Sequence, residues 1–169
     1  MSLNILQVFS SRIHEIMRNN VVFISIILTI LVSSCSSDRK LRVDTSVMEP
    51  TIKKGDVLSY THLVSKIKKG DVVYFEMPIN DGTSIMRVFG LPGDEIIIDF
   101  DEGIYLNGTL CYSYEVIDDN LKKNIKFGSG NPYIVPENCY YLLGDNWKIA
   151  NDSRCWGALE QNRIIGVIN

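Results

Sequence analysis

Side chains that could bind a metal or react as thiols are few in this chain of 169 residues. The only histidines are His14 and His62, and neither is spaced with a cysteine as a zinc site requires. Three cysteines follow residue 100; in an oxidising compartment two of them could pair, or all three could be buried, inert thiols. They are Cys111, Cys139 and Cys155. We therefore expect neither a metal site nor a cofactor.

Three short segments that combine Gly-Asp turns with proline, carboxylates or arginine are more informative. The first spans residues 47–52 and leads into Gly55-Asp56, the second spans 86–94, and the third joins 144–146 to 152–157. A single Gly-Asp turn would carry no functional information. An ordered set of three such segments is highly specific, so it can be compared with known families.

In this order and at these separations, the segments resemble the signature boxes of the type I signal peptidases. The family shows Ser-Met-x-Pro-Thr in the first box, Lys-Arg before Gly-Leu-Pro-Gly-Asp in the second, and Gly-Asp-Asn in the third. The resemblance covers most of residues 43–169. It implies serine endopeptidase chemistry, in which a serine hydroxyl attacks the scissile carbonyl and a lysine held neutral by apolar surroundings removes the hydroxyl proton.

The two positions that carry this chemistry in the family hold apolar residues here. Val47 stands at the nucleophile position and has no hydroxyl, and Met86 stands at the base position, with the length of lysine but no amine. Ala150 replaces the usual serine of the third box, and Trp147 replaces the usual arginine. Removing the nucleophile or base of such a unit typically lowers the rate about a millionfold. The first hypothesis is therefore a signal-peptidase homologue without proteolytic activity.

The family residues that this chain retains are those that a fold needs for turns and buried ion pairs. Beside the Gly-Asp turns they are Pro50, Asp145, Asp152 and Arg154. The losses affect only the groups that the chemistry requires, so they are concerted. This contrast favours a redirected function on a preserved fold.

Ser46 supports a second hypothesis, an active signal peptidase whose nucleophile is displaced by one residue. On an extended strand, a shift of one residue turns the side chain to the opposite face, although a local bulge can reverse this. Ser46 would also need a base. Arg87 cannot lose a proton at working pH, and His62 lies far in sequence from position 86.

The resemblance also implies a cleft that holds an extended peptide by strand addition. We expect strands around 45–48 and 83–87 to form it, with Thr45, Ser46, Met48, Ser84 and Ile85 as the substrate-binding residues. The partners would be signal peptides, exported preproteins or an active paralogous peptidase. A third hypothesis is a structural lipoprotein that keeps the fold and has lost the cleft.

The elements that position these residues read as β-structure from residue 40 onward, because short apolar or alternating runs are separated by Gly-Asp and Asn-Gly turns. Residues 105–110 predict a hairpin with Asn107-Gly108 at its tip. Residues 52–57 are echoed by 67–72, which predicts two similar turns into strands. The resemblance implies a signal-peptidase/LexA-like folded sheet or partial barrel over 39–169, with its core in 39–95 and 138–169 and a small β-rich insertion in 96–137.

Residues 1–38 form a separate N-terminal segment with an apolar, uncharged run at 21–32. The run is closer in length to a signal-peptide core than to a spanning helix. It ends at Val-Ser-Ser-Cys35, which resembles a lipobox with Cys35 as the lipidated residue. The alternative is an uncleaved apolar anchor helix. Both interpretations predict a membrane-anchored protein of the bacterial cell envelope, with its domain on the extracytoplasmic side.

Charge and composition exclude one further class. The net charge is −3 and 46% of the residues are hydrophobic, which suits a packed core. No basic excess is present for nucleic-acid binding. We therefore expect no nucleic-acid partner.

Overall fold

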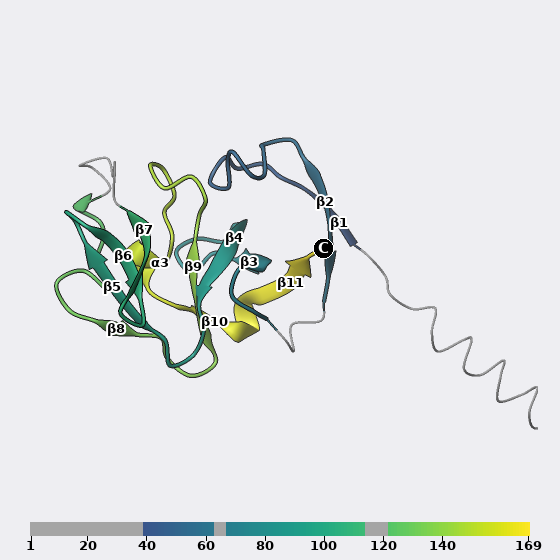
Figure 1. Ribbon diagram of the computed structural model, residues 1–169. Coiled ribbons are helices and arrows are strands. Elements are labelled where there is room, and N and C mark those ends of the chain that lie inside the picture. The colour runs from purple at the N-terminus through teal and green to yellow at the C-terminus, as the bar shows by residue number, and fades with distance from the viewer. Residues whose placement is uncertain (1–38, 63–66, 114–121) are drawn as a thin grey trace, which may run out of the picture. The chain divides into compact units, whose positions relative to one another are not determined.

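The computed structural model describes residues 39–62, 67–113 and 122–169 (Figure 1). The apolar run and Cys35 lie outside these residues, so the anchor and the lipidation site remain predictions. Within the described ranges, no helix has the length and apolar character needed to cross a membrane. Almost all regular elements of the described part are strands, which confirms the all-β prediction.

The larger of two sheets has seven strands in the order β1-β2-β11-β3-β4-β9-β10, and every neighbouring pair is antiparallel. Strand β11, from the C-terminal end of the chain, lies between β2 and β3. The strands are β1 (Arg39–Arg42), β2 (Val57–Thr61), β3 (Val72–Glu76), β4 (Thr83–Gly90), β9 (Cys139–Leu143), β10 (Leu159–Glu160) and β11 (Ile164–Ile168).

The smaller sheet has four strands in the order β7-β6-β5-β8. They lie between Glu95 and Ile134 in the sequence, and the insertion predicted for 96–137 stays a prediction. Two short helical turns, α3 and η1, lie between the last strands of the larger sheet. The bounds are β5 (Glu95–Asp99), β6 (Gly103–Leu106), β7 (Thr109–Ser113), β8 (Tyr133–Ile134), α3 (Ser153–Trp156) and η1 (Gln161–Arg163).

The predicted hairpin is confirmed between β6 and β7. Leu106 pairs with Thr109, and the two residues between them have positive φ angles of 50° at Asn107 and 75° at Gly108. A two-residue turn of this hand matches the twist of the flanking strands, and asparagine and glycine adopt it at low cost. The Asn-Gly dipeptide therefore fixes the register of this hairpin.

The two echoed segments form the same turn, as predicted. The backbone N–H of Lys53 donates to the carboxylate of Asp56 at 2.8 Å, and that of Lys68 donates to Asp71 at 2.8 Å. In each case the aspartate precedes a strand of the larger sheet, β2 or β3. These aspartates are thus explained by local turn geometry, in which an Asx side chain satisfies a nearby backbone donor.

Strand β9 contributes to two hydrophobic cores because its side chains alternate between its faces. Tyr140 and Leu142 are buried in the core of the larger sheet, whereas Tyr141 and Leu143 are buried in the core that includes β5 and β6. The smaller sheet therefore packs on the same strand that leads into the third signature segment.

Candidate functional site

The first segment lies in the connection between β1 and β2. The loop is closed at its base by two backbone hydrogen bonds of 2.8 Å, from Val43 to Asp56 and from Gly55 to Val43. The expectation of a strand over 45–48 is wrong: β1 ends at Arg42, and the chain turns where the Glu49 N–H donates to the Ser46 carbonyl at 3.1 Å. Ser46 is therefore not in a strand, and the alternation of side chains between the two faces of a strand does not decide where its side chain points.

Val47 and Met86 pack against the same hydrophobic core. Met86, on β4, is 1% exposed and belongs to the core of the larger sheet with Met48, which is 0% exposed. Val47 is half-buried and packs against this core. The positions predicted for the nucleophile and the base are thus occupied by side chains that fill apolar space.

Gly144 brings the substituted positions together. A methyl group added to Gly144 would lie 2.5 Å from the Ala150 Cβ and 2.7 Å from the Val47 carbonyl oxygen. The Asn146 N–H donates to that same carbonyl at 2.8 Å. Two of the substituted positions, Val47 and Ala150, therefore surround one glycine that has no room for a side chain.

An ion pair joins all three signature segments. Arg87 donates to the two carboxylate oxygens of Asp145 at 2.9 and 2.6 Å, and the Thr51 hydroxyl also donates to this carboxylate. Burial raises the pKa of Asp145, but hydrogen bonds from Arg87 and Thr51 outweigh this effect and lower it. The bond to Asp145 raises the pKa of Arg87. Arg87 is therefore a positioning cation and no base.

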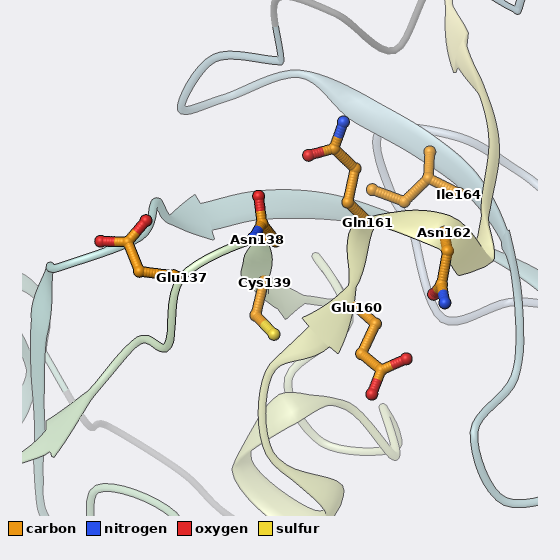
Figure 2. A pocket seen from close by; sticks show the side chains of 7 residues that line it. All are labelled: Glu137, Asn138, Cys139, Glu160, Gln161, Asn162 and Ile164. Atoms are coloured by element: carbon orange, nitrogen blue, oxygen red, sulfur yellow. The ribbon is translucent and has the colours of Figure 1, made fainter.

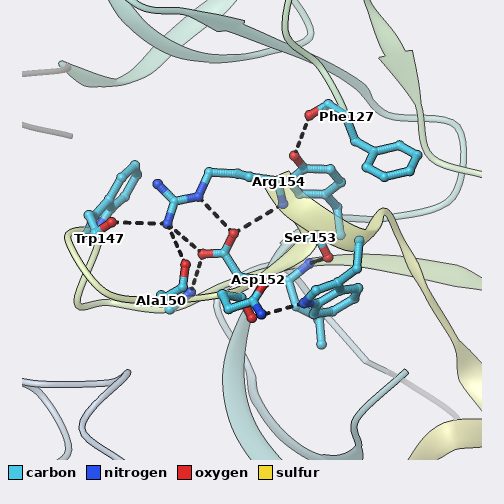
Figure 3. Close-up of polar contacts among 11 residues, drawn as sticks. Phe127, Trp147, Ala150, Asp152, Ser153 and Arg154 are labelled. Atoms are coloured by element: carbon cyan, nitrogen blue, oxygen red, sulfur yellow. Dashed lines mark hydrogen bonds and ion pairs between the residues drawn. The ribbon is translucent and has the colours of Figure 1, made fainter. Parts of the chain in front are cut away.

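A second, fully buried ion pair holds the third segment (Figure 3). Asp152 and Arg154 have side chains that are 0% exposed and make two charged hydrogen bonds of 2.8 Å. Arg154 also donates to the Trp147 carbonyl at 3.2 Å, and Asp152 accepts from the Gly144 N–H at 3.1 Å. The pair therefore fixes the loop from 144 to 150 against the core.

The predicted substrate-binding residues fall into two groups. Thr45, Ser46 and Ser84 are half-buried, whereas Met48 and Ile85 are buried in the core at 0% and 2% exposure. The substrate-binding assignment stays a prediction for all five. In the structure, Met48 and Ile85 pack in the core. A sequence pattern cannot distinguish an apolar core residue from an apolar residue that lines a pocket.

The edge of β4 next to these residues is open. Its residues from Arg87 to Gly90 pair with β9, but β9 ends at Leu143 and does not reach Thr83–Met86. Within the described residues, Thr83–Met86 pair with β3 alone. Backbone N–H and C=O groups on the other edge are thus positioned to pair with an added strand.

Ser46 has a carbonyl that accepts hydrogen bonds from Asn146 Nδ2 at 3.2 Å and from Glu49 N. Among the described residues, no basic side chain donates to or accepts from its hydroxyl. His62 follows β2 at the end where Tyr60 pairs with Arg39. Ser46 follows β1 at the opposite end of this strand pair, where Arg42 pairs with Val57. The structure therefore offers Ser46 no partner base among these residues.

A hollow of about 690 Å³ lies apart from the three segments (Figure 2). Its walls carry the carboxylates of Glu137 and Glu160 on either side of Cys139, whose thiol pKa is raised by burial and by Glu160. In the part of the chain that the structure describes, no three His, Cys, Asp or Glu side chains are grouped to hold a metal. Cys111, Cys139 and Cys155 are all free thiols.

Sequence reasoning missed one cluster, in which an aromatic ring of the smaller sheet meets an aromatic ring of the loop after β9. Tyr112, on β7, packs edge-on against Trp147 with ring centroids 4.3 Å apart. The guanidinium of Arg154 lies 5.5 Å from the Trp147 ring. The tryptophan at position 147, where the family has arginine, marked this position as unusual. Nothing in the sequence pointed to its partner Tyr112.

Comparisons with known proteins agree with the sequence motifs. A family model described as "Signal peptidase, peptidase S26" matches residues 14–169. Signal peptidase I of Bacillus licheniformis is 29% identical over 154 residues, covering 86% of this chain and 81% of that protein. Signal peptidase IB of Staphylococcus aureus is 28% identical over 138 residues, covering 72% and 71%. The crystal structure of a signal peptidase I from Enterococcus faecalis aligns with a TM-score of 0.44 and 28% identity, over 62% of this chain and 97% of that one.

Proposed function

Because this chain belongs to the signal peptidase family, peptidase S26, we propose that it is a membrane-tethered homologue that binds peptides of exported proteins without cleaving them. The observation that carries the proposal is the packing of Val47 and Met86 against one apolar core at the nucleophile and base positions. Neither side chain has an atom that can exchange a proton at working pH. The acyl-transfer step thus lacks both its nucleophile and its base.

Met86 also explains why the fold tolerates this loss. A lysine at a site that is 1% exposed must be desolvated, which is costly for the charged form. Methionine of similar length fills the same space without that cost. The substitution therefore exchanges a chemical group for core packing, and the ion pairs that hold the three segments stay in place.

Peptide binding can survive without the dyad because strand addition uses backbone groups. The open edge of Thr83–Met86 offers main-chain donors and acceptors, and Thr45 and Ser46 directly precede the first signature segment. Main-chain hydrogen bonds give affinity in this mode, while pockets for alternate side chains give specificity. We therefore favour signal-peptide-bearing preproteins as ligands.

The tether is part of the proposal and rests on residues 1–38. The apolar run at 21–32 and Cys35 support a lipid anchor, with the domain on the extracytoplasmic side of a bacterial membrane. Mass spectrometry of the mature N-terminus tests it. A lipidated Cys35 is expected at the N-terminus, and an unmodified Cys35 within an uncleaved chain would reject the lipid anchor.

Cleavage of a preprotein with a small-x-small site tests the central claim. The full chain in phospholipid nanodiscs should bind the preprotein but leave it intact. The double variant Val47→Ser plus Met86→Lys should gain specific cleavage if the cleft is preserved, with the single variant Val47→Ser as a matched inactive control. Specific cleavage by the unmodified chain that Ser46→Ala abolishes would overturn the proposal in favour of an active enzyme.

A further inference from the structure

A hollow of about 420 Å³ lies where β7 of the smaller sheet meets β4 and the loop after β9. Two of its lining residues, Phe89 and Leu143, belong to the second core, whereas Val88 belongs to the first. Gly144 and Asp145 also line it. This volume falls in the range of small-ligand pockets, which is about 300–1,000 Å³.

Three aromatic rings contribute to its wall. Phe89, Tyr112 and Trp147 line the hollow, with ring centroids of Tyr112 4.3 Å from Trp147 and 5.7 Å from Phe89. Burial raises the pKa of the Tyr112 hydroxyl, so this ring stays neutral at physiological pH. Clustered aromatic edges and faces favour an aromatic or large aliphatic guest.

The charges at its rim are already paired. Lys69 Nζ lies 2.9 Å from the Asp94 carboxylate, and Arg87 binds both carboxylate oxygens of Asp145. A charged ligand would have to compete with one of these pairs. A neutral ligand meets no such competition, so the rim selects against net charge.

Trp147 is held in place before any ligand arrives. Its carbonyl accepts a hydrogen bond from the buried Arg154 at 3.2 Å, and its ring lies under that guanidinium and against Tyr112. A pre-organised wall saves part of the ordering cost of binding. The family's arginine at this position would make the same wall cationic, so the aromatic pocket is a departure of this chain.

We propose that this hollow is a second binding pocket, which takes one uncharged aromatic or large aliphatic side chain of a bound peptide. The proposal rests on the proposed peptide-binding function. The link between the two sites is short, because the Val47 carbonyl fills the space where Gly144 would carry a side chain, and Gly144 itself lines the hollow. A peptide along the open edge of β4 therefore passes close to both.

Titration of the full chain in nanodiscs with capped amino-acid amides tests the pocket. Calorimetry should show N-acetyl-phenylalaninamide and N-acetyl-leucinamide binding at least about tenfold more tightly than the aspartate and lysine analogues. The chain has two tryptophans, so Trp156→Phe leaves Trp147 as the reporter, and its emission should shift on binding. Equal affinities for all four amides would overturn the proposal.

Two variants locate the site, and one serves as a control. Tyr112→Ala and Trp147→Arg should each weaken N-acetyl-phenylalaninamide about tenfold or more. Tyr105→Ala, which removes a tyrosine of β6 outside the hollow, should leave the affinity unchanged. Thermal unfolding confirms that each variant is folded, and folded variants with unchanged affinity would overturn the assignment.

A peptide panel separates a peptide side chain from a free small molecule. A single Phe is scanned through five positions on each side of a small-x-small motif. One position should gain about tenfold in affinity, and Trp147→Arg should remove the gain. If amides bind but no peptide position gains, the peptide assignment is wrong. If peptides bind without any gain and amides do not bind, the pocket is wrong while the proposed peptide-binding function stands.

Discussion

The two ion pairs among the signature residues differ in burial and in what they connect. Asp152 and Arg154 are two residues apart and 0% exposed, whereas Arg87 and Asp145 are 31% and 16% exposed and join segments far apart in sequence. The first pair holds one loop against the core, and the second fastens three segments at the protein surface. Retained family residues thus serve two mechanical roles, neither of which requires catalysis.

Removing one partner of the buried pair should have the largest effect. Asp152→Ala leaves the Arg154 guanidinium charged in the core, which should lower the free energy of unfolding by about 3–5 kcal/mol. Denaturant unfolding of the full chain measures this. Asp44→Ala, at an exposed position, is the control. A loss below about 1 kcal/mol would contradict the view that this pair anchors the loop.

The half-exposed pair should contribute less. Asp145→Asn keeps the shape but loses the charged bidentate bond, and we expect a loss of about 1–2 kcal/mol. A double-mutant cycle with Arg87→Ala isolates the pairwise coupling. A loss as large as that of Asp152→Ala would remove the distinction between the two pairs.

The pH dependence should sharpen the comparison at the acid end. The pKa of Asp145 is lowered in the folded state, because bonds from Arg87 and Thr51 outweigh the opposing effect of burial. Its stabilising contribution is therefore complete above the unfolded pKa of about 3.9 and is lost as pH falls through the folded value. The stability difference between the unmodified chain and Asp145→Asn should be constant from pH 7 to 5 and shrink below pH 4. A stability difference that grows as the pH falls would contradict the lowered pKa of Asp145.

The surface pair of Lys69 and Asp94 should have the smallest effect. The Lys69 side chain is 41% exposed, and its Nζ lies 3.0 and 2.9 Å from the two carboxylate oxygens of Asp94. Exposed pairs of this kind contribute about 0–1 kcal/mol, so Lys69→Ala should change the free energy of unfolding by less than about 1 kcal/mol. High salt should reduce this change further, because salt screens the attraction between exposed charges. A larger loss of stability would mean that burial does not determine the order in which these ion pairs contribute to the free energy of unfolding.

Local patterns predicted the elements that depend on neighbouring residues. The Asn107-Gly108 hairpin and the repeated Gly-Asp turns form as expected, because a few adjacent residues determine each turn. Motif spacing also singled out Val47 and Met86, and the structure packs both against the same core. Their assignment to the nucleophile and base positions stays a prediction.

Long-range contacts escaped prediction for a physical reason. The Thr51 hydroxyl meets the Asp145 carboxylate across 94 residues of sequence, and no periodicity links the two. Tyr112 lies in β7 of the smaller sheet and Trp147 in the loop after β9, so their contact depends on how that loop packs against the smaller sheet. The burial of Met48 and Ile85 likewise follows from the core around them and not from their own motif.

The sharing of β9 between two cores has a consequence for how this protein can evolve. Deleting or inserting one residue within β9 would exchange its faces, so Tyr140 and Leu142 would trade environments with Tyr141 and Leu143. Both cores would be disrupted by a single event. Strand β7, whose five residues are all exposed, carries no such constraint. Change in length is therefore expected to accumulate at the outer edge of the smaller sheet, next to the aromatic hollow, and to be rejected at the strand that both sheets share.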